Sequence, residues 1–266
     1  MIPLRAALRT SLALAPATLA ASVLGLAPNG LAAATCATTA GLFGLGVVWL
    51  RGGAFVDVAV RASGARRAIA LTFDDGPHPE HTPRVLDALA ACGARATFFV
   101  VGDKAHAHPE VVRAIAAAGH ALGLHSSTHD CLFAARSTAR LVDDLRANRA
   151  VVEDAIGAPV TLVRPPVGLT SPSVASAVHA LGLRVVGWSA RAYDGIGSPS
   201  PATILLRLAP DLAPGAIVLL HDARERGDDV PPALAALPAL LDELARRDLT
   251  SVTVPALLDG LREPAA

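Results

Sequence analysis

The chain has 266 residues, of which 52% are hydrophobic and 17% charged, and its 23 basic residues balance its 23 acidic ones. The zero net charge argues against a nucleic-acid-binding protein, which needs a basic surface. The apolar content excludes a disordered chain. The three cysteines, Cys36, Cys92 and Cys131, are too widely spaced for a disulfide framework or a cysteine-based zinc site.

The N-terminal segment contains the excess of hydrophobicity. From Thr10 to Leu50 the chain holds no Asp, Glu, Lys, Arg or His. A spanning helix needs about 20 apolar residues, and Pro28-Asn29-Gly30 is a turn signal in the middle of this run. The pattern predicts two spans, about Thr10–Ala27 and Leu31–Leu50, so residues 1–55 are expected to be a membrane-anchoring two-helix hairpin.

A secretory signal peptide is the alternative for this segment. Arg5 and Arg9 would form its basic region, Leu12–Leu26 its apolar region, and Ala32-Ala33-Ala34 its cleavage site. For the hairpin, the positive-inside rule places both ends in the cytoplasm, because Arg5 and Arg9 precede the spans and Arg51 follows them. We therefore expect a bacterial-type inner-membrane protein, with the side of the soluble part left open.

Residues 56–266 are expected to form one α/β catalytic domain, a distorted (β/α) barrel of about seven parallel strands. Short apolar runs alternate with helical patterns there, as in a parallel sheet that is covered by helices. The expected strands are Ala68–Phe73, Ala96–Val101, Ala121–Leu124, Val160–Val163, Arg184–Trp188, Ala216–Leu220 and Leu249–Thr253. The expected helices are Thr82–Ala91, Pro109–Ala118, Thr138–Ile156, Ser171–Leu181, Pro201–Leu208, Pro231–Arg246 and Pro255–Leu261.

Polar residues directly follow several expected strands, where barrel enzymes carry their working groups. Asp74 and Asp75 end the first strand, and because neighbours on a strand point to opposite sides, one is expected to bind a metal while the other faces a water. His125 and His129 converge on one ion if the segment makes a helical turn. A carboxylate with two imidazoles suits Zn²⁺, Co²⁺ or Fe²⁺ better than Ca²⁺.

Two further strand ends carry polar groups. Arg164, in the stiff Arg164-Pro165-Pro166-Val167-Gly168 loop, offers a fork to a carboxylate. His221, at the end of Leu219-Leu220-His221-Asp222, suits general acid catalysis. Each motif alone also fits a structural role, such as a turn, a buried histidine or a rigid loop, and only their shared placement at strand ends points to a site.

The sequence resembles the polysaccharide deacetylase family (NodB homology domain, carbohydrate esterase family 4) over about Ala68 to Leu258. The motifs that carry the resemblance are T-F-D-D-G-P, H-S-S-T-H, R-P-P-V-G and L-L-H-D, which occur here at Thr72–Pro77, His125–His129, Arg164–Gly168 and Leu219–Asp222. The resemblance implies a metal-dependent hydrolase that removes N-acetyl groups from an amino-sugar glycan, peptidoglycan or a chitin-like oligosaccharide.

The resemblance also implies roles for individual residues. Asp75, His125 and His129 would hold a divalent metal, most simply zinc, with cobalt, iron or nickel as alternatives. Asp74 would be the general base, oriented by Arg164, and His221 would protonate the leaving amine. The Val167 N–H would bind the oxyanion, and Trp188 and Leu219 would form the pocket for the acetyl methyl.

Two motifs depart from the family pattern. The family usually has an aromatic residue where Val167 stands. Its fourth motif usually has Asp and Trp where this chain has Arg191 and Gly195. In the family that Asp supports the catalytic histidine, which leaves Asp194 or Asp222 to support His221 here.

The expected partners are an amino-sugar glycan and the membrane, with no nucleic acid. A lipid-linked sugar, deacetylated or deformylated at the membrane, is the alternative substrate, and the predicted hairpin favours it. A catalytically silent scaffold protein is the alternative from another class, and the retention of all five catalytic and metal-site acids and histidines argues against it.

Overall fold

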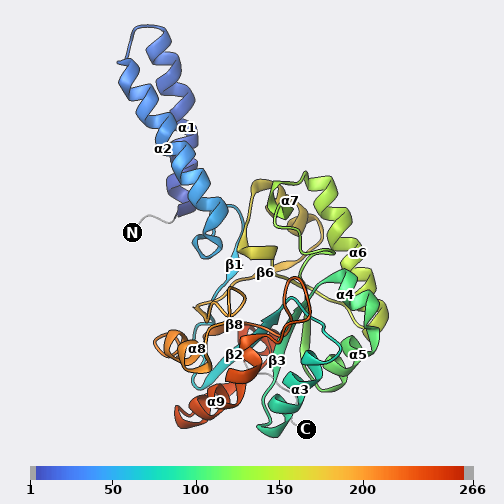
Figure 1. The fold of residues 1–266 in the computed structure, drawn as a ribbon. Helices are drawn as coiled ribbons and strands as arrows, with labels where there is room; N and C mark the ends of the chain where they lie inside the picture. The colour runs from blue at the N-terminus through green and yellow to red at the C-terminus, as the bar shows by residue number, and fades with distance from the viewer. Residues whose placement is uncertain (1–3, 261–266) are drawn as a thin grey trace.

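A helical hairpin stands on a curled α/β domain in the computed structural model of the chain, which describes residues 4–260 (Figure 1). The hairpin consists of α1 (Leu4–Val23) and α2 (Asn29–Val48), both long and apolar enough to cross a membrane. The turn precedes its predicted position, because Pro28 is the N-cap of α2 and Asn29 begins the helix. Ser11 of α1 and Thr39 of α2 share a hydrogen bond of 2.5 Å between their hydroxyls, the kind of polar contact that holds helices together in a bilayer.

The foot of the hairpin is attached to the domain by hydrogen bonds from both sides. Arg5 pairs with Asp57 at 2.8 Å and donates from Nε to the Gly53 carbonyl at 2.9 Å. Thr170 donates its backbone N–H to Val47 O and its hydroxyl to Gly46 O, at 3.0 and 3.1 Å. Both ends of the hairpin therefore lie at the domain, with the turn far from it (Figure 1).

A nine-stranded sheet forms the centre of the domain, and its strands pair in parallel. Eight strands follow the order β1-β6-β5-β4-β3-β2-β8-β7, and β9 pairs beside the start of β2. The strands are β1 (Val58–Ala59), β2 (Ala68–Asp74), β3 (Ala96–Val100), β4 (Ala121–Leu124), β5 (Leu162–Val163), β6 (Arg184–Val186), β7 (Ala190–Arg191), β8 (Ile217–His221) and β9 (Thr250–Ser251).

The segment that enters the domain nearly closes this sheet into a barrel. β1 pairs with β6, and two residues after β1 Arg61 forms an antiparallel bridge with Ala216, just before β8. The predicted (β/α) barrel is thus confirmed. The short strands β1 and β7 were not predicted. β5, β6 and β9 are shorter than expected because only two or three residues of each pair with a neighbouring strand.

Helices cover the outside of the sheet (Figure 1). They are α3 (His81–Ala91), α4 (Gly102–Ala107), α5 (Pro109–Ala117), α6 (Thr138–Ile156), α7 (Pro172–Ala180), α8 (Pro201–Leu208), α9 (Pro232–Arg246) and α10 (Val254–Leu258). α6 has its predicted bounds because Ser137 caps its first turn and Gly157 ends it in the left-handed conformation. α4 was not predicted.

The inside of the barrel is filled by a buried apolar cluster beneath the strand ends. Ala70, Phe99 and Ile217 belong to one buried cluster that includes Leu257 of α10, which contacts β2. Phe99 also lies under the guanidinium of Arg164, 4.2 Å from its carbon to the ring centroid. The apolar filling therefore ends where the polar groups begin, at the C-terminal ends of the strands.

Candidate active site

A cavity of about 390 Å³ opens at the C-terminal ends of the strands. Eight of the nine predicted site residues line it, and the ninth, Arg164, lies fully buried beneath and donates to Asp74. The lining residues are Val48, Asp74, Asp75, His125, His129, Val167, Gly168, Leu169, Trp188, Arg191, Tyr193, Gly195, Ile196, Leu219, His221 and Glu225.

The two adjacent aspartates both face this cavity, which corrects the expectation that they point to opposite sides. Asp74 is the last residue of β2, and Asp75 follows in the left-handed conformation with φ 72°. The strand alternation ends there, so the second carboxylate turns back toward the first. Both residues are buried, with 3% and 5% of their surface exposed.

His125 and His129 also converge, but not through a helical turn as predicted. The segment after β4 bends instead, with Ser126 and His129 in left-handed conformations. The buried Asn148 of α6 fixes this bend, because its side-chain amide donates to the Ser126 carbonyl at 2.7 Å. The two imidazole rings end 4.9 Å apart.

Asp75, His125 and His129 form a donor set that fits a divalent metal. One ligand atom from each lies within 4.8 Å of the others, and Asp75 Oδ1 is 3.4 Å from His125 Nε2 and 3.2 Å from His129 Nε2. His125 donates from Nδ1 to the Arg164 carbonyl at 2.7 Å, which leaves its Nε2 free for a metal. Asp75 Oδ1 is buried with no hydrogen-bond partner in residues 4–260, as expected of an oxygen reserved for a cation.

The electrostatics of the triad favour an ionised carboxylate. Burial alone would raise the pKa of Asp75, but the nearby imidazoles, His125 foremost, outweigh it and hold the pKa well below its usual range. Burial and the neighbouring His125 lower the pKa of His129. An ionised carboxylate beside a readily deprotonated imidazole is the state that a metal requires.

Arg164 connects the floor of the cavity to the barrel. Its Nη1 donates to Asp74 Oδ1 at 2.6 Å and to the Thr72 hydroxyl at 2.8 Å. Its other nitrogens donate to the carbonyls of Val186 and Gly187. The side chain is fully buried with all three nitrogens bonded, so it holds Asp74 in one position while balancing its charge.

One wall of the cavity comes from the loop that follows β5. Val167 has φ 58° and is 59% exposed, an unusual backbone conformation for a β-branched residue. A Cβ on the next residue, Gly168, would lie 2.5 Å from the Trp188 ring, so only glycine allows the loop to approach the indole. Trp188 and Leu219 are 7% and 9% exposed and complete a narrow apolar wall.

His221 ends β8, and the structure chooses Asp194 as its partner. Asp194 Oδ1 lies 3.1 Å from His221 Nδ1, and Oδ2 accepts the His221 backbone N–H at 2.8 Å. Burial would lower the pKa of His221, but the carboxylate of Asp194, with those of Asp75 and Asp74, raises it to about 9. Asp222, the other candidate, instead accepts from the Thr82 hydroxyl at 2.5 Å, and burial raises its pKa to about 7.

Strained backbone gathers around this cavity. Six described residues other than glycine have positive φ, and five of them lie in or beside the site. They are Asp75, Ser126, His129, Val167 and Tyr193. Such conformations cost about 1–3 kcal/mol each, persist where the surrounding structure enforces them, and cluster at functional sites.

Several lining residues were not predicted. Val48 reaches the cavity from the end of α2, and Arg191 and Tyr193 come from β7 and the segment after it. Glu225 places a carboxylate oxygen 3.7 Å from His129 Nδ1. No motif marks Val48 or Glu225, whereas Arg191 stood out as a departure from the family pattern.

Comparisons with known proteins agree with this geometry. Residues 61–186 match the polysaccharide deacetylase family. A peptidoglycan-N-acetylglucosamine deacetylase of Bacillus cereus is 34% identical over 194 residues, covering 72% of this chain and 88% of that protein. A chitooligosaccharide deacetylase of Sinorhizobium fredii is 37% identical over 203 residues, covering 74% and 86%.

Solved structures show the same fold. A peptidoglycan N-acetylglucosamine deacetylase superposes with a TM-score of 0.71 at 27% identity, over 76% of this chain and 92% of that one. A family 4 carbohydrate esterase from Streptomyces lividans, in complex with acetate, gives 0.63 at 31% identity over 71% and 93%. A mutant of a pseudoenzyme of that esterase family, with restored activity, gives 0.67 at 26% identity over 75% and 70%. Because an inactive relative can share this fold, activity has to be argued from the residues of the site.

Proposed function

This chain is a hydrolase of the polysaccharide deacetylase family, and we propose that it removes N-acetyl groups from an amino-sugar glycan of the peptidoglycan or chitin-oligosaccharide kind. One observation carries the proposal: a complete metal triad, a buried acid held by an arginine and a histidine held by an aspartate all face one cavity. Amide hydrolysis needs these three functions together, to activate water, to polarise the carbonyl and to protonate a poor leaving group.

We assign the metal site to Asp75, His125 and His129. A divalent metal bound there supplies Lewis acidity, which polarises the amide carbonyl and lowers the pKa of water. Zinc suits this set of one carboxylate and two imidazoles, and cobalt, iron and nickel are the alternatives.

Asp74 is the proposed general base. Its Oδ1 is held by Arg164 at 2.6 Å, and its Oδ2 faces the triad, 3.8 Å from His125 Nε2. This arrangement leaves one oxygen free to take the proton from the water that attacks the amide carbon. Arg164 balances the charge of this carboxylate and fixes its orientation toward the triad.

His221 is the proposed general acid. The carboxylate of Asp194 keeps its imidazole protonated at neutral pH, because the pKa is raised to about 9. The proton passes to the amide nitrogen as the carbon–nitrogen bond breaks, and acetate and a free amine leave.

The remaining site residues position the acyl group. The left-handed backbone at Val167 presents its N–H as the proposed donor to the oxyanion. Trp188 and Leu219 form the proposed pocket for the acetyl methyl, and their apolar surfaces exclude water from it.

We further propose that residues 1–55 anchor the chain in a membrane and that residues 56–266 form the catalytic domain. The bonds that tie the hairpin to the domain, from Arg5 and Thr170, support an uncleaved hairpin over a signal peptide. The positive-inside rule then favours a cytoplasmic catalytic domain. N-terminal sequencing of the mature protein distinguishes anchor from signal peptide, and reporter fusions after Ala266 give the side.

A second substrate class, a membrane lipid-linked sugar that is deacetylated or deformylated, is favoured by one observation. Val48, the last residue of the second apolar helix, lines the catalytic cavity itself. A substrate held in the bilayer would therefore meet the site without leaving the membrane surface.

Acetate and formate release tests the proposal. Full-length zinc-loaded protein in detergent is incubated with N-acetylchitooligosaccharides, peptidoglycan and N-acylated lipid-linked sugars. We expect acetate from at least one of them, and a loss of about 10²–10⁴-fold in kcat in Asp74→Asn at unchanged zinc content. A protein that binds zinc yet releases neither acid from any substrate contradicts the proposal.

A further inference from the structure

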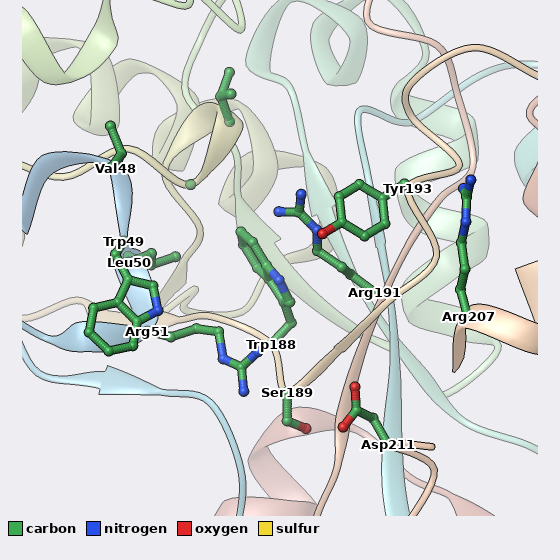
Figure 2. Close-up of a pocket in the computed structure, with 12 residues that line it drawn as sticks. Val48, Trp49, Leu50, Arg51, Trp188, Ser189, Arg191, Tyr193, Arg207 and Asp211 are labelled. Carbon is green, nitrogen blue, oxygen red and sulfur yellow. The ribbon is translucent and has the colours of Figure 1, made fainter. Parts of the chain in front are cut away.

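A second cavity, of about 400 Å³, adjoins the catalytic one and is lined in part by the residues that end and follow α2. Figure 2 shows its lining residues. The two cavities share six lining residues: Val48, Val167, Gly168, Trp188, Arg191 and Tyr193. The second cavity adds Trp49, Leu50, Arg51, Ser189, Arg207 and Asp211. We call it the arginine cavity, because Arg51, Arg191 and Arg207 line it.

The arginine cavity carries an excess of positive charge. Asp211 is the single carboxylate among its lining residues, against three guanidinium groups. Within residues 4–260, none of Arg51, Arg191 and Arg207 has a carboxylate oxygen within 4.0 Å. A guanidinium group offers forked donors that match a phosphate, so three of them without a carboxylate partner can bind an anion here.

Two of the arginines are held in position around Tyr193. The guanidinium carbon of Arg191 lies 3.7 Å from the centre of the Tyr193 ring, and that of Arg207 lies 5.7 Å from it (Figure 2). Arg207 also donates to the Ala192 carbonyl at 3.0 Å. Arg191 Nε is buried and has no hydrogen-bond partner in the described part of the chain. The side chains are thus ordered by stacking while donors remain free.

Arg191 occupies the position at which the family usually has an acidic residue, so the charge beside the catalytic cavity is reversed in this chain. Val167 and Gly195 stand where the family usually has aromatic residues, so two surfaces for stacking sugar rings are missing as well. A Cβ at Gly195 would lie 2.7 Å from the His221 ring, so a larger residue there requires the histidine to move. All three departures lie on the wall of the catalytic cavity. Arg191 adds positive charge there, and Val167 and Gly195 leave space where aromatic side chains usually stand.

From these observations we infer that the arginine cavity binds the phosphate of an N-acetylated amino sugar whose C1 is esterified to phosphate or diphosphate. This inference rests on the proposed deacetylase function and names its substrate class. On such a sugar the phosphate is attached to the carbon next to the one that carries the acetamido group. Two adjoining cavities that share Arg191 can take both groups of one sugar, with the acetamide at the triad and the phosphate at the arginines.

The location of the cavity favours a lipid as the carrier of that phosphate. Trp49 and Arg51 directly follow α2, and Trp49 is 48% exposed. A tryptophan and a basic residue at the end of a spanning helix mark the level of the lipid headgroups. The arginine cavity therefore lies at the height at which a lipid-bound phosphate meets water.

Binding of a prenyl diphosphate tests this inference without requiring catalysis. Zinc-loaded full-length protein in phosphatidylcholine nanodiscs is titrated calorimetrically with geranylgeranyl diphosphate, which carries neither sugar nor acetyl group. We expect Arg191→Gln, and separately the pair Arg51→Gln and Arg207→Gln, to weaken binding about tenfold or more, as the loss of charge-assisted hydrogen bonds implies. Arg113→Gln, an exposed arginine on α5, is the matched control and should bind as the unchanged protein does. The metal triad is unchanged in every variant, so any binding of the diphosphate probe to the zinc ion contributes equally to all of them.

The same titration with inorganic pyrophosphate identifies the source of the phosphate. Binding at least tenfold weaker than that of the prenyl compound supports a lipid carrier, whereas equal binding assigns the cavity to a water-soluble sugar phosphate. Equal binding of geranylgeranyl diphosphate by Arg191→Gln and the unchanged protein overturns the inference.

Deacetylation provides the second readout. The ratio of kcat/KM for prenyl-diphosphate-linked N-acetylglucosamine to that for neutral N-acetylchitotetraose should fall about tenfold or more in Arg191→Gln, and should be maintained in Arg113→Gln. If the unchanged protein releases neither acetate nor formate from these substrates or from peptidoglycan, the proposed function fails. The binding comparison still decides whether the arginine cavity takes a phosphate.

Discussion

The floor and the outer wall of the catalytic cavity are built by different means. On the floor, Asp74 and His125 are 3% and 2% exposed and lie at the ends of β2 and β4, which flank β3 in the sheet. On the outer wall, Val167 and Tyr193 are 59% and 46% exposed and come from loops. The floor keeps the motifs of the family, while the wall departs from them. This difference is expected if the buried strand ends carry the proposed chemistry and the exposed loops carry the proposed choice of substrate.

The metal triad should be the most sensitive part of the floor. Asp75→Asn keeps nearly the same shape but replaces the charged carboxylate, whose buried Oδ1 has no hydrogen-bond partner in residues 4–260, with a neutral amide. Because even residues that merely orient metal ligands contribute 10–100-fold to affinity, we expect zinc affinity to fall by more than about 100-fold and acetate release to disappear. Metal analysis after dialysis measures this. Asp143→Asn, an exposed aspartate on α6, is the control. Full zinc occupancy in Asp75→Asn would contradict the assignment of Asp75 as a metal ligand.

The pair of Arg164 and Asp74 should dominate the stability of the floor. Arg164→Met leaves the Asp74 carboxylate buried without its cation, which costs about 3–5 kcal/mol of unfolding free energy. Replacing both, as Asp74→Asn with Arg164→Met, should restore part of that loss, because no lone charge remains. Thermal unfolding in detergent measures the effect. Arg184→Met, in an exposed pair with Asp259, should change stability by no more than about 1 kcal/mol.

The pH dependence of activity should report the pair of His221 and Asp194. The raised pKa of about 9 keeps His221 protonated, so activity should fall as the pH rises through about 9. Asp194→Asn removes the carboxylate that contributes most to raising the pKa of His221. The alkaline fall in activity should therefore move toward the ordinary histidine pKa of about 6.5. Rate profiles between pH 5 and 10 measure the shift, and an unmoved limb would assign it to another group.

The same pair contributes to stability with a definite sign. Because the pKa of His221 is raised above that of an unfolded histidine, protonation favours the folded state. The contribution is fully present below about pH 6.5 and is lost as the pH rises through about 9. Asp194→Asn should flatten this part of the stability profile.

The outer wall should respond in selectivity and little in chemistry. Val167→Tyr restores the aromatic residue of the family pattern, and stacking on a sugar should lower KM for N-acetylchitotetraose about twofold to tenfold, at a kcat that changes little. Val230→Tyr adds the same side chain at a position that is 50% exposed and outside both cavities. A large loss of kcat in Val167→Tyr would contradict this prediction and would show that the outer wall contributes to the chemical step.

The floor could be predicted from the sequence because its residues follow strands that the apolar pattern marks. Asp74, His125, Arg164 and His221 all lie at strand ends, as expected. Their local conformations could not be predicted. The strand alternation suggested that Asp74 and Asp75 diverge, but a left-handed residue brings them together.

The wall could not be predicted, because it depends on contacts between distant segments. Val48 lines the cavity only because Thr170 holds the end of α2 by two hydrogen bonds. β1 is two residues long and too short for a periodic signal, yet it positions the chain that joins hairpin to barrel. Arg191 was visible as a departure from the family, but its stacking on Tyr193 is a tertiary feature.

The two hydrogen bonds from Thr170 to the end of α2 also set a distance. With the hairpin in a bilayer, these bonds would fix the height of the catalytic cavity above the membrane, because the end of the membrane-crossing helix is itself part of the cavity wall. The distance between the catalytic cavity and the membrane surface would then be constant. Such an anchor would favour the sugar nearest the lipid over glycan that extends farther into the water.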